Sequence, residues 1–235
     1  MRSILIILFF MLMIVSAKSY SQKWQPGRFT DVKGNAESGF IRFGSGKGPI
    51  KDEGFIEFKE DNKSEPFKLS ASDLRSFVVG KDSFVVAHPP RNESWAKNEF
   101  DFVKVALDED IKLYITNGGG RGRGHGISIE PGIGAGVGTG GFGGGVGGGI
   151  AIPIGGGGGS YEKTTWYYGE NTASMKRLTD LNFEDVMADI MGDYPEVVDK
   201  IHAKVYVLEN IDRLLAYYNQ AKGAESKKQK AESTK

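Results

Sequence analysis

The chain has 235 residues, enough for one domain with appendages or for two small domains, and its 30 basic and 30 acidic residues give a formal net charge of zero. That balance supplies no electrostatic reason for a nucleic-acid partner. The absence of cysteine excludes disulfides, thiol catalysis and cysteine-ligated metals, while 34 glycines dilute a hydrophobic content of 39%.

The first segment has the layout of a secretory signal peptide. Arg2 supplies a positive charge, and residues 4–15 form an uninterrupted apolar run that is short for a membrane span. Small residues precede two candidate cleavage sites, after Ala17 and after Ser21, and we favour Ser21. We therefore predict a signal peptide at 1–21 and export to the periplasm, the outer-membrane surface or the extracellular space, with an uncleaved membrane anchor as the alternative.

Residues 22–117 are predicted as the first part of a β-rich domain. A strand containing Phe29 is followed by turn residues at 33–35 and by a second β-prone run ending at Phe43. A helical turn is expected at 72–75 and a tight acidic turn at 108–110. Further strands are predicted at 54–59, 66–69, 76–79, 83–88, 100–107 and 111–116.

Residues 118–160 form a glycine-rich insertion that carries no charge from Pro131 to Tyr161, where 17 glycines occur. The first interpretation is a flexible loop, whose closure costs grow only slowly with length. The second is a membrane or assembly helix, because glycines recur at every fourth position from 132 to 148. So much glycine would disfavour a helix in water.

The third interpretation is an extended β-hairpin. Apolar residues occupy odd positions before Gly140–Gly141 and even positions after it, as expected when a two-residue turn places residue i opposite residue 281 − i. The same rule pairs Leu113 with Tyr168 and Ile115 with Trp166 in the flanking strands. The apolar residues on one face form a candidate interaction arm: Ile127, Ile129, Ile133, Val137, Phe142, Val146, Ile150, Ile152 and Ile154.

The C-terminal part, 161–220, is predicted to complete the sheet and then to become helical. Strands are expected at 164–170 and 174–178. One helix follows Asn182, which can act as a cap, a second restarts near Pro195, and a third carries an apolar stripe from Leu208 to Tyr218. The tail, 221–235, has no apolar side chain larger than alanine and is predicted to be disordered.

Strands followed by helices predict an α+β fold: an antiparallel sheet or open barrel of short strands, two or three C-terminal helices, and the glycine-rich segment as a long hairpin insertion. Because strands and helices do not alternate, a nucleotide-binding parallel sheet is not expected.

No catalytic, cofactor-binding or metal-binding residue is predicted. The stretch GSGKG at 44–48 lacks the residues of a phosphate-binding loop and is interpreted as a turn. His88, His125 and His202 lie far apart without metal-ligand spacing, and the acidic turn at 108–110 lacks the further ligands of a calcium loop.

The stretches GRFTDVKGNAESGFIRF, DLRSFVVGKDSFVV, VALDEDIKLYIT and MGDYPEVVDKIHAKVYVLENIDRLLAYYNQ resemble uncharacterised exported proteins of the Bacteroidota. The resemblance covers 27–117 and 161–220, and the glycine-rich insertion departs from it. It implies no catalytic or binding residue. We expect a non-enzymatic envelope protein that contacts another envelope protein or the outer-membrane surface, with no nucleic-acid partner. A membrane-associated protein whose glycine-rich segment inserts or assembles is the alternative, and an unrecognised hydrolase is the third hypothesis.

Overall fold

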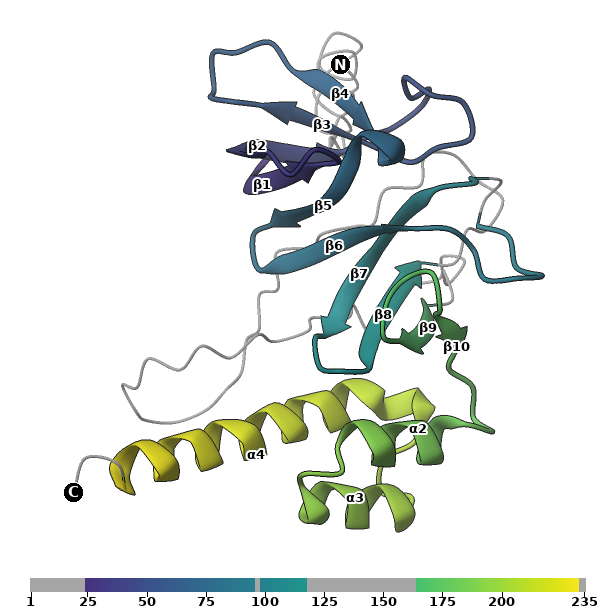
Figure 1. The fold of residues 1–235 in the computed structure, drawn as a ribbon, viewed down its shortest axis with the longest axis vertical. Helices are drawn as coiled ribbons and strands as arrows, with labels where there is room; N and C mark the ends of the chain where they lie inside the picture. The colour runs from purple at the N-terminus through teal and green to yellow at the C-terminus, as the bar shows by residue number, and fades with distance from the viewer. Residues whose placement is uncertain (1–23, 96–97, 118–163, 233–235) are drawn as a thin grey trace, which may run out of the picture.

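The computed structural model describes residues 24–95, 98–117 and 164–232 (Figure 1). They form one antiparallel sheet with the strand order β10-β9-β8-β7-β6-β5-β1-β2-β3-β4, followed by three C-terminal helices. The prediction of an α+β fold with an open sheet and C-terminal helices is confirmed. The strands are β1 (Gln25–Asp31), β2 (Ala36–Phe43), β3 (Phe55–Lys59), β4 (Phe67–Ser70), β5 (Leu74–Val79), β6 (Asp82–Ala87), β7 (Asp101–Leu107), β8 (Lys112–Asn117), β9 (Thr164–Gly169) and β10 (Lys176–Arg177).

The first five strands curl around a core rich in phenylalanine. The ring of Phe77 stacks on Phe84 with centroids 4.9 Å apart and meets Phe102 edge-on at the same distance. Phe84 and Phe102 belong to β6 and β7, so this core continues into the second half of the sheet. These phenylalanines gather on one face of the sheet because successive side chains of a strand point to opposite faces.

Gly27 of β1 and Gly39 of β2 allow these strands to pack closely against each other and against β5 and β3. Gly27 and Gly39 are paired across the two strands. A Cβ on Gly39 would lie 2.7 Å from the Phe58 ring and would also clash with the carbonyl oxygen of Lys59, so the backbone there approaches more closely than any other residue allows.

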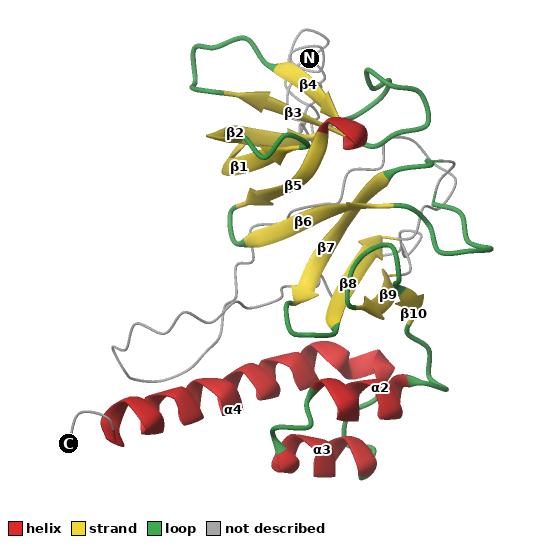
Figure 2. Ribbon diagram, viewed as in Figure 1, coloured by secondary structure: helices red, strands yellow, loops and turns green. Residues whose placement is uncertain are grey.

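The second half of the sheet is covered on both faces. Leu113, Ile115 and Trp166 point toward the helices, and Tyr114 and Tyr167 point to the opposite face, where Trp95 and Met175 cover them. Figure 2 shows the three helices gathered beside the β7–β9 end of the sheet, away from the curled first half.

The three helices bury one apolar stripe each, as predicted. They are α2 (Phe183–Ile190), α3 (Pro195–His202) and α4 (Ile211–Glu232), and α3 begins with proline at its first position, where no intrahelical donor is lost. Asn182 precedes α2, but its side chain does not cap that helix. Its amide oxygen accepts instead from the backbone N–H of Thr179 at 2.7 Å, so it stabilises the preceding turn.

The end of the chain differs from the prediction. The tail from residue 221 was expected to be disordered, whereas α4 continues to Glu232. The prediction considered only the lack of large apolar residues. Alanine, lysine, glutamate and glutamine are good helix formers, and the buried first half of α4 supplies the turns that an isolated helix must nucleate at a cost.

Candidate functional site

The point where the chain enters and leaves the glycine-rich segment is the candidate site, and it lies at the end of β8 and the start of β9. The predicted partners Leu113–Tyr168 and Ile115–Trp166 are confirmed. Pairing continues without a shift to Asn117 and Thr164, the last described residues on each side. The nine residues of the candidate interaction arm, and the signal-peptide segment 1–21, lie outside the described residues.

A buried polar network stabilises β9 near this point. The indole N–H of Trp95 donates to the Tyr167 hydroxyl oxygen at 3.0 Å, and the Tyr167 hydroxyl donates to Glu93 Oε2 at 2.6 Å. Tyr167 is 1% exposed and Trp95 is 7% exposed. Burial raises the pKa of Tyr167 to about 12, and the hydrogen bond to the Glu93 carboxylate acts in the same direction.

The segment that supplies Glu93 and Trp95, the 88–100 connection, also contacts the first half of the molecule. The backbone N–H of Glu99 donates to Asp52 O at 2.7 Å, and that of Gly54 donates to Phe100 O at 2.8 Å. This connection therefore joins the loop before β3 to the face of β9. Sequence reasoning missed it, since Trp95 and Tyr167 are separated by 72 positions and no spacing rule relates them.

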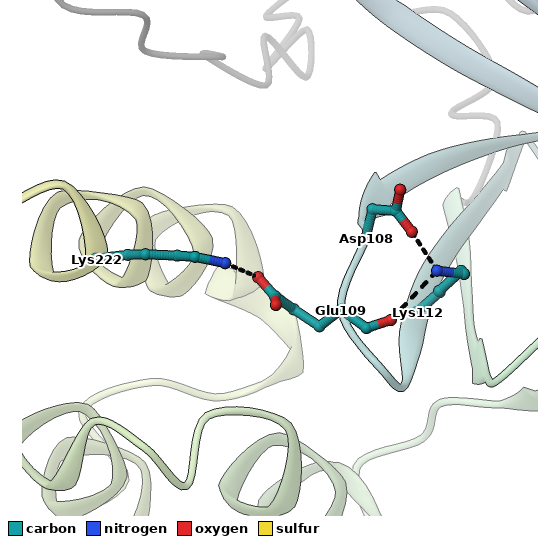
Figure 3. A network of polar contacts seen from close by, with 4 residues as sticks. All are labelled: Asp108, Glu109, Lys112 and Lys222. Atoms are coloured by element: carbon teal, nitrogen blue, oxygen red, sulfur yellow. Dashed lines mark hydrogen bonds and ion pairs between the residues drawn. The ribbon is translucent and has the colours of Figure 1, made fainter. Parts of the chain in front are cut away.

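The acidic turn between β7 and β8 binds lysines of its own chain (Figure 3). Asp108 forms an ion pair with Lys112, whose ammonium also donates to the Glu109 backbone oxygen at 3.3 Å. The Glu109 side chain forms an ion pair with Lys222 of α4. The turn was predicted correctly, and the Glu109 carboxylate links the sheet to α4.

Tyr218 of α4 lies beside the same turn and is 3% exposed. Burial raises its pKa to about 12, and the negative charge of Glu109 adds to the effect. Its proton is therefore retained in the folded protein between pH 10 and pH 12 but lost on unfolding, so the stability it contributes falls as the pH rises through that range. We expect Tyr218 to account for a loss of about 2 kcal/mol of unfolding free energy between pH 9 and pH 12.

Urea unfolding of the wild-type protein and of Tyr218→Phe at pH 8, 9, 10, 11 and 12 measures this effect. The two proteins should differ in the slope of stability against pH above pH 10, because phenylalanine does not titrate. Parallel curves over the whole range would contradict the assignment.

The stretch GSGKG, predicted as a turn, is an irregular connection after β2 with a bend at Gly46, and it packs against an aromatic ring. A Cβ on Gly48 would lie 2.7 Å from the Phe55 ring, and one on Gly44 would overlap the same ring. Gly46 has a φ of 85°, which glycine adopts without strain. Gly44 and Gly48 thus lie directly against the Phe55 ring.

The described histidines form no common site. His88 packs against Phe100, with ring centroids 5.5 Å apart, and His202 Nδ1 lies 2.9 Å from Glu184 Oε1. His125 lies outside the described residues. Within residues 24–95, 98–117 and 164–232, no three histidine, aspartate or glutamate side chains are grouped so as to hold a metal ion.

The sequence matches no protein-family model, and neither the curated proteins nor the solved structures contain a significant match to it. Of the helices in the described part of the chain, none is both long and apolar enough to cross a membrane.

Proposed function

We propose that this chain is a non-enzymatic exported envelope protein, in which the α+β domain presents the glycine-rich segment as a binding arm. The observation that carries the proposal is the register of β8 and β9. The rule that residue i faces residue 281 − i comes from the symmetry of the glycine-rich segment about Gly140–Gly141, and it predicted that register. The paired residues of β8 and β9 themselves lie outside the segment.

The constant register of β8 and β9 defines where the chain leaves the sheet and where it returns. Asn117 and Thr164 are opposite each other, and 23 residues separate each of them from the centre of Gly140–Gly141. If pairing continues, the nine apolar residues lie on one face of a two-stranded ribbon. Such a ribbon needs a second surface to bury that face, because an isolated hairpin is marginally stable in water.

The hydrogen bonds of Tyr167, near the start of β9, are consistent with a structural role at the point where the arm joins the sheet. The Tyr167 hydroxyl accepts from Trp95 and donates to Glu93, so both of these hydrogen bonds serve to hold the 88–100 connection against β9. A rigid root is what an arm requires if it is to present its apolar face in one orientation.

The binding partner that we propose for the arm is another envelope protein, with no nucleic acid involved. Insertion or assembly of the arm at the outer-membrane surface is the alternative, favoured by the absence of charge from Pro131 to Tyr161. An unrecognised hydrolase is retained as the third candidate only because carboxylates distant in sequence can converge.

The proposal is tested by replacing residues 118–163 with Asn-Gly, the two-residue turn that suits paired positions such as Asn117 and Thr164. We expect the shortened protein to keep its unfolding free energy to within about 0.5 kcal/mol, because Asn117 and Thr164 are already paired and a two-residue turn can join them without shifting β8 or β9. Affinity capture from the native envelope should lose the partner that the full-length protein retains. A second variant keeps the length and changes Ile129, Ile133, Ile150 and Ile152 to serine.

Loss of capture with both variants supports an apolar arm. Retention of the partner by the shortened protein would place the binding surface elsewhere, and failure of the shortened protein to fold would show that the segment belongs to the domain core. Release of full-length protein by high salt or carbonate would count against membrane insertion.

A further inference from the structure

The outer face of the curled first half carries an excess of positive charge. Glu57 of β3 lies between Arg42 of β2 and Lys68 of β4, which are its partners in the two neighbouring strands. Because every second residue of a strand points to the same side, Lys59 of β3 and Arg28 of β1 also belong to this face, and the phenylalanine core lies behind it. We call the surface formed by these four basic side chains and one carboxylate the cationic face.

Aromatic rings lie among the cations of this face. The Arg42 guanidinium carbon is 4.5 Å from the centre of the Trp24 ring, and Lys59 Nζ is 4.9 Å from it. Lys59 Nζ also lies 5.6 Å from the centre of the Phe40 ring. Arg42 donates through Nε to Glu57 Oε2 at 2.6 Å, and the other three basic side chains of the face form no ion pair within the described part of the chain. The cationic face therefore keeps an excess of three positive charges.

The helical end of the molecule has the opposite charge. Residues 178–199, which span α2 and most of α3, carry seven aspartate and glutamate side chains and no lysine or arginine. Six of the seven are exposed, and among the described residues only Glu184 forms an ion pair, with His202. Leu181, in the turn before α2, is 96% exposed. We call the surface formed by Leu181 and these seven carboxylates the acidic face.

The two faces lie at opposite ends of the molecule, so they can meet only between two molecules. Figure 1 shows β1–β4 at one end of the long axis and α2 and α3 at the other, with the rest of the sheet between them. Because the net charge of the chain is zero, the positive excess on the cationic face is balanced by negative charge elsewhere in the same chain. Surfaces of opposite charge attract and orient each other, and the Trp24 ring offers an apolar cover for Leu181.

We propose that the cationic face binds the acidic face of a second copy of this chain, so that molecules associate head to tail. The two surfaces in contact differ, so the contact can repeat from one molecule to the next and does not close in a two-fold dimer. This inference is independent of the proposed function, because neither face includes the glycine-rich segment.

The first experiment is sedimentation velocity of the purified protein over a range of concentrations, in about 0.01 M and about 1 M salt. At low salt we expect the average mass to rise with protein concentration beyond that of a dimer. At high salt, screening of the charges should return the protein to the monomer. A protein that stays monomeric at low salt would overturn the inference. Equal association at both salt concentrations would also overturn it, because an apolar contact such as that of the glycine-rich arm is not weakened by salt.

The second experiment disables one face at a time. Lys59→Glu/Lys68→Glu reverses two charges of the cationic face, and Asp185→Lys/Asp189→Lys reverses two exposed charges of the acidic face. Each variant alone should stay monomeric at low salt. An equal mixture of the two should form a one-to-one dimer and nothing larger, because only one intact pair of faces remains. A mixture that stays monomeric would overturn the pairing of these two faces.

The matched control is Lys33→Glu/Lys81→Glu, which makes the same change of charge at exposed lysines in the β1–β2 and β5–β6 turns. It should associate as the wild type does, and an equal loss in the control would overturn the role of the cationic face. The neutral variant Lys59→Gln/Lys68→Gln should weaken association about tenfold, with an unchanged circular dichroism spectrum, and it keeps the test decisive if the charge reversal prevents folding.

Discussion

Replacing Tyr167 with phenylalanine is expected to lower the free energy of unfolding by about 3 kcal/mol, because it leaves the buried Trp95 N–H without an acceptor and Glu93 without its donor. The ring itself is retained, so the loss comes from the two hydrogen bonds. Urea unfolding at pH 7, followed by far-ultraviolet circular dichroism, measures it.

The matched control is Tyr168→Phe. Tyr168 is the next residue of β9, and its side chain packs on the other face of the sheet, against the helices. We expect the control to change the unfolding free energy by less than about 0.5 kcal/mol. Trp95 fluorescence should also shift to longer wavelength in Tyr167→Phe, as water reaches the indole. A loss that is equal in the two variants would show that the network does not stabilise β9.

Substituting Gly39 with alanine should cost about 3 kcal/mol, near the upper end of the range for overpacking. The added methyl group would overlap the Lys59 carbonyl oxygen and lie 2.7 Å from the Phe58 ring. Because one of these contacts is backbone, relief requires that β2 and β3 move apart rather than that a side chain rotate. Chemical denaturation of the purified variant gives the value.

Gly192→Ala serves as its control. A Cβ at Gly192 would make only ordinary contacts at 3.5 Å, so alanine there should be neutral or stabilise the protein by up to about 1 kcal/mol through the unfolded chain. If Gly39→Ala were as stable as Gly192→Ala, the close packing of β1, β2 and β3 would have to be looser than the structure shows.

Local patterns were enough to predict the strands and helices of the described residues. Alternating apolar residues gave the strands, and the 3.6-residue stripe from Leu208 to Tyr218 gave the start of α4. The register of β8 and β9 was also predictable, because the alternation changes phase at a single Gly–Gly pair and every partner sum follows from it.

Long-range pairing could not be read in the same way. β1 pairs with β5, so that Phe29 lies opposite Phe77, although β2, β3 and β4 lie between the two strands in sequence. Nothing in the alternation of either strand distinguishes this partner from another. The Tyr167 network was missed for a related reason: its members contribute one side chain each from separate segments, and only the fold brings them together.

The central claim is that the glycine-rich segment continues β8 and β9 as a ribbon in the same register. The chain has no cysteine, so an introduced pair can form only one disulfide. The measurement is the extent of oxidation of Ala135→Cys/Val146→Cys, whose positions sum to 281, compared with Ala135→Cys/Gly148→Cys, which is out of register. We predict a complete disulfide in the first protein and little in the second, because only directly opposite strand positions bring the Cα atoms within about 6 Å. Equal oxidation of the two pairs would contradict the claim and identify the segment as a loop without fixed pairing.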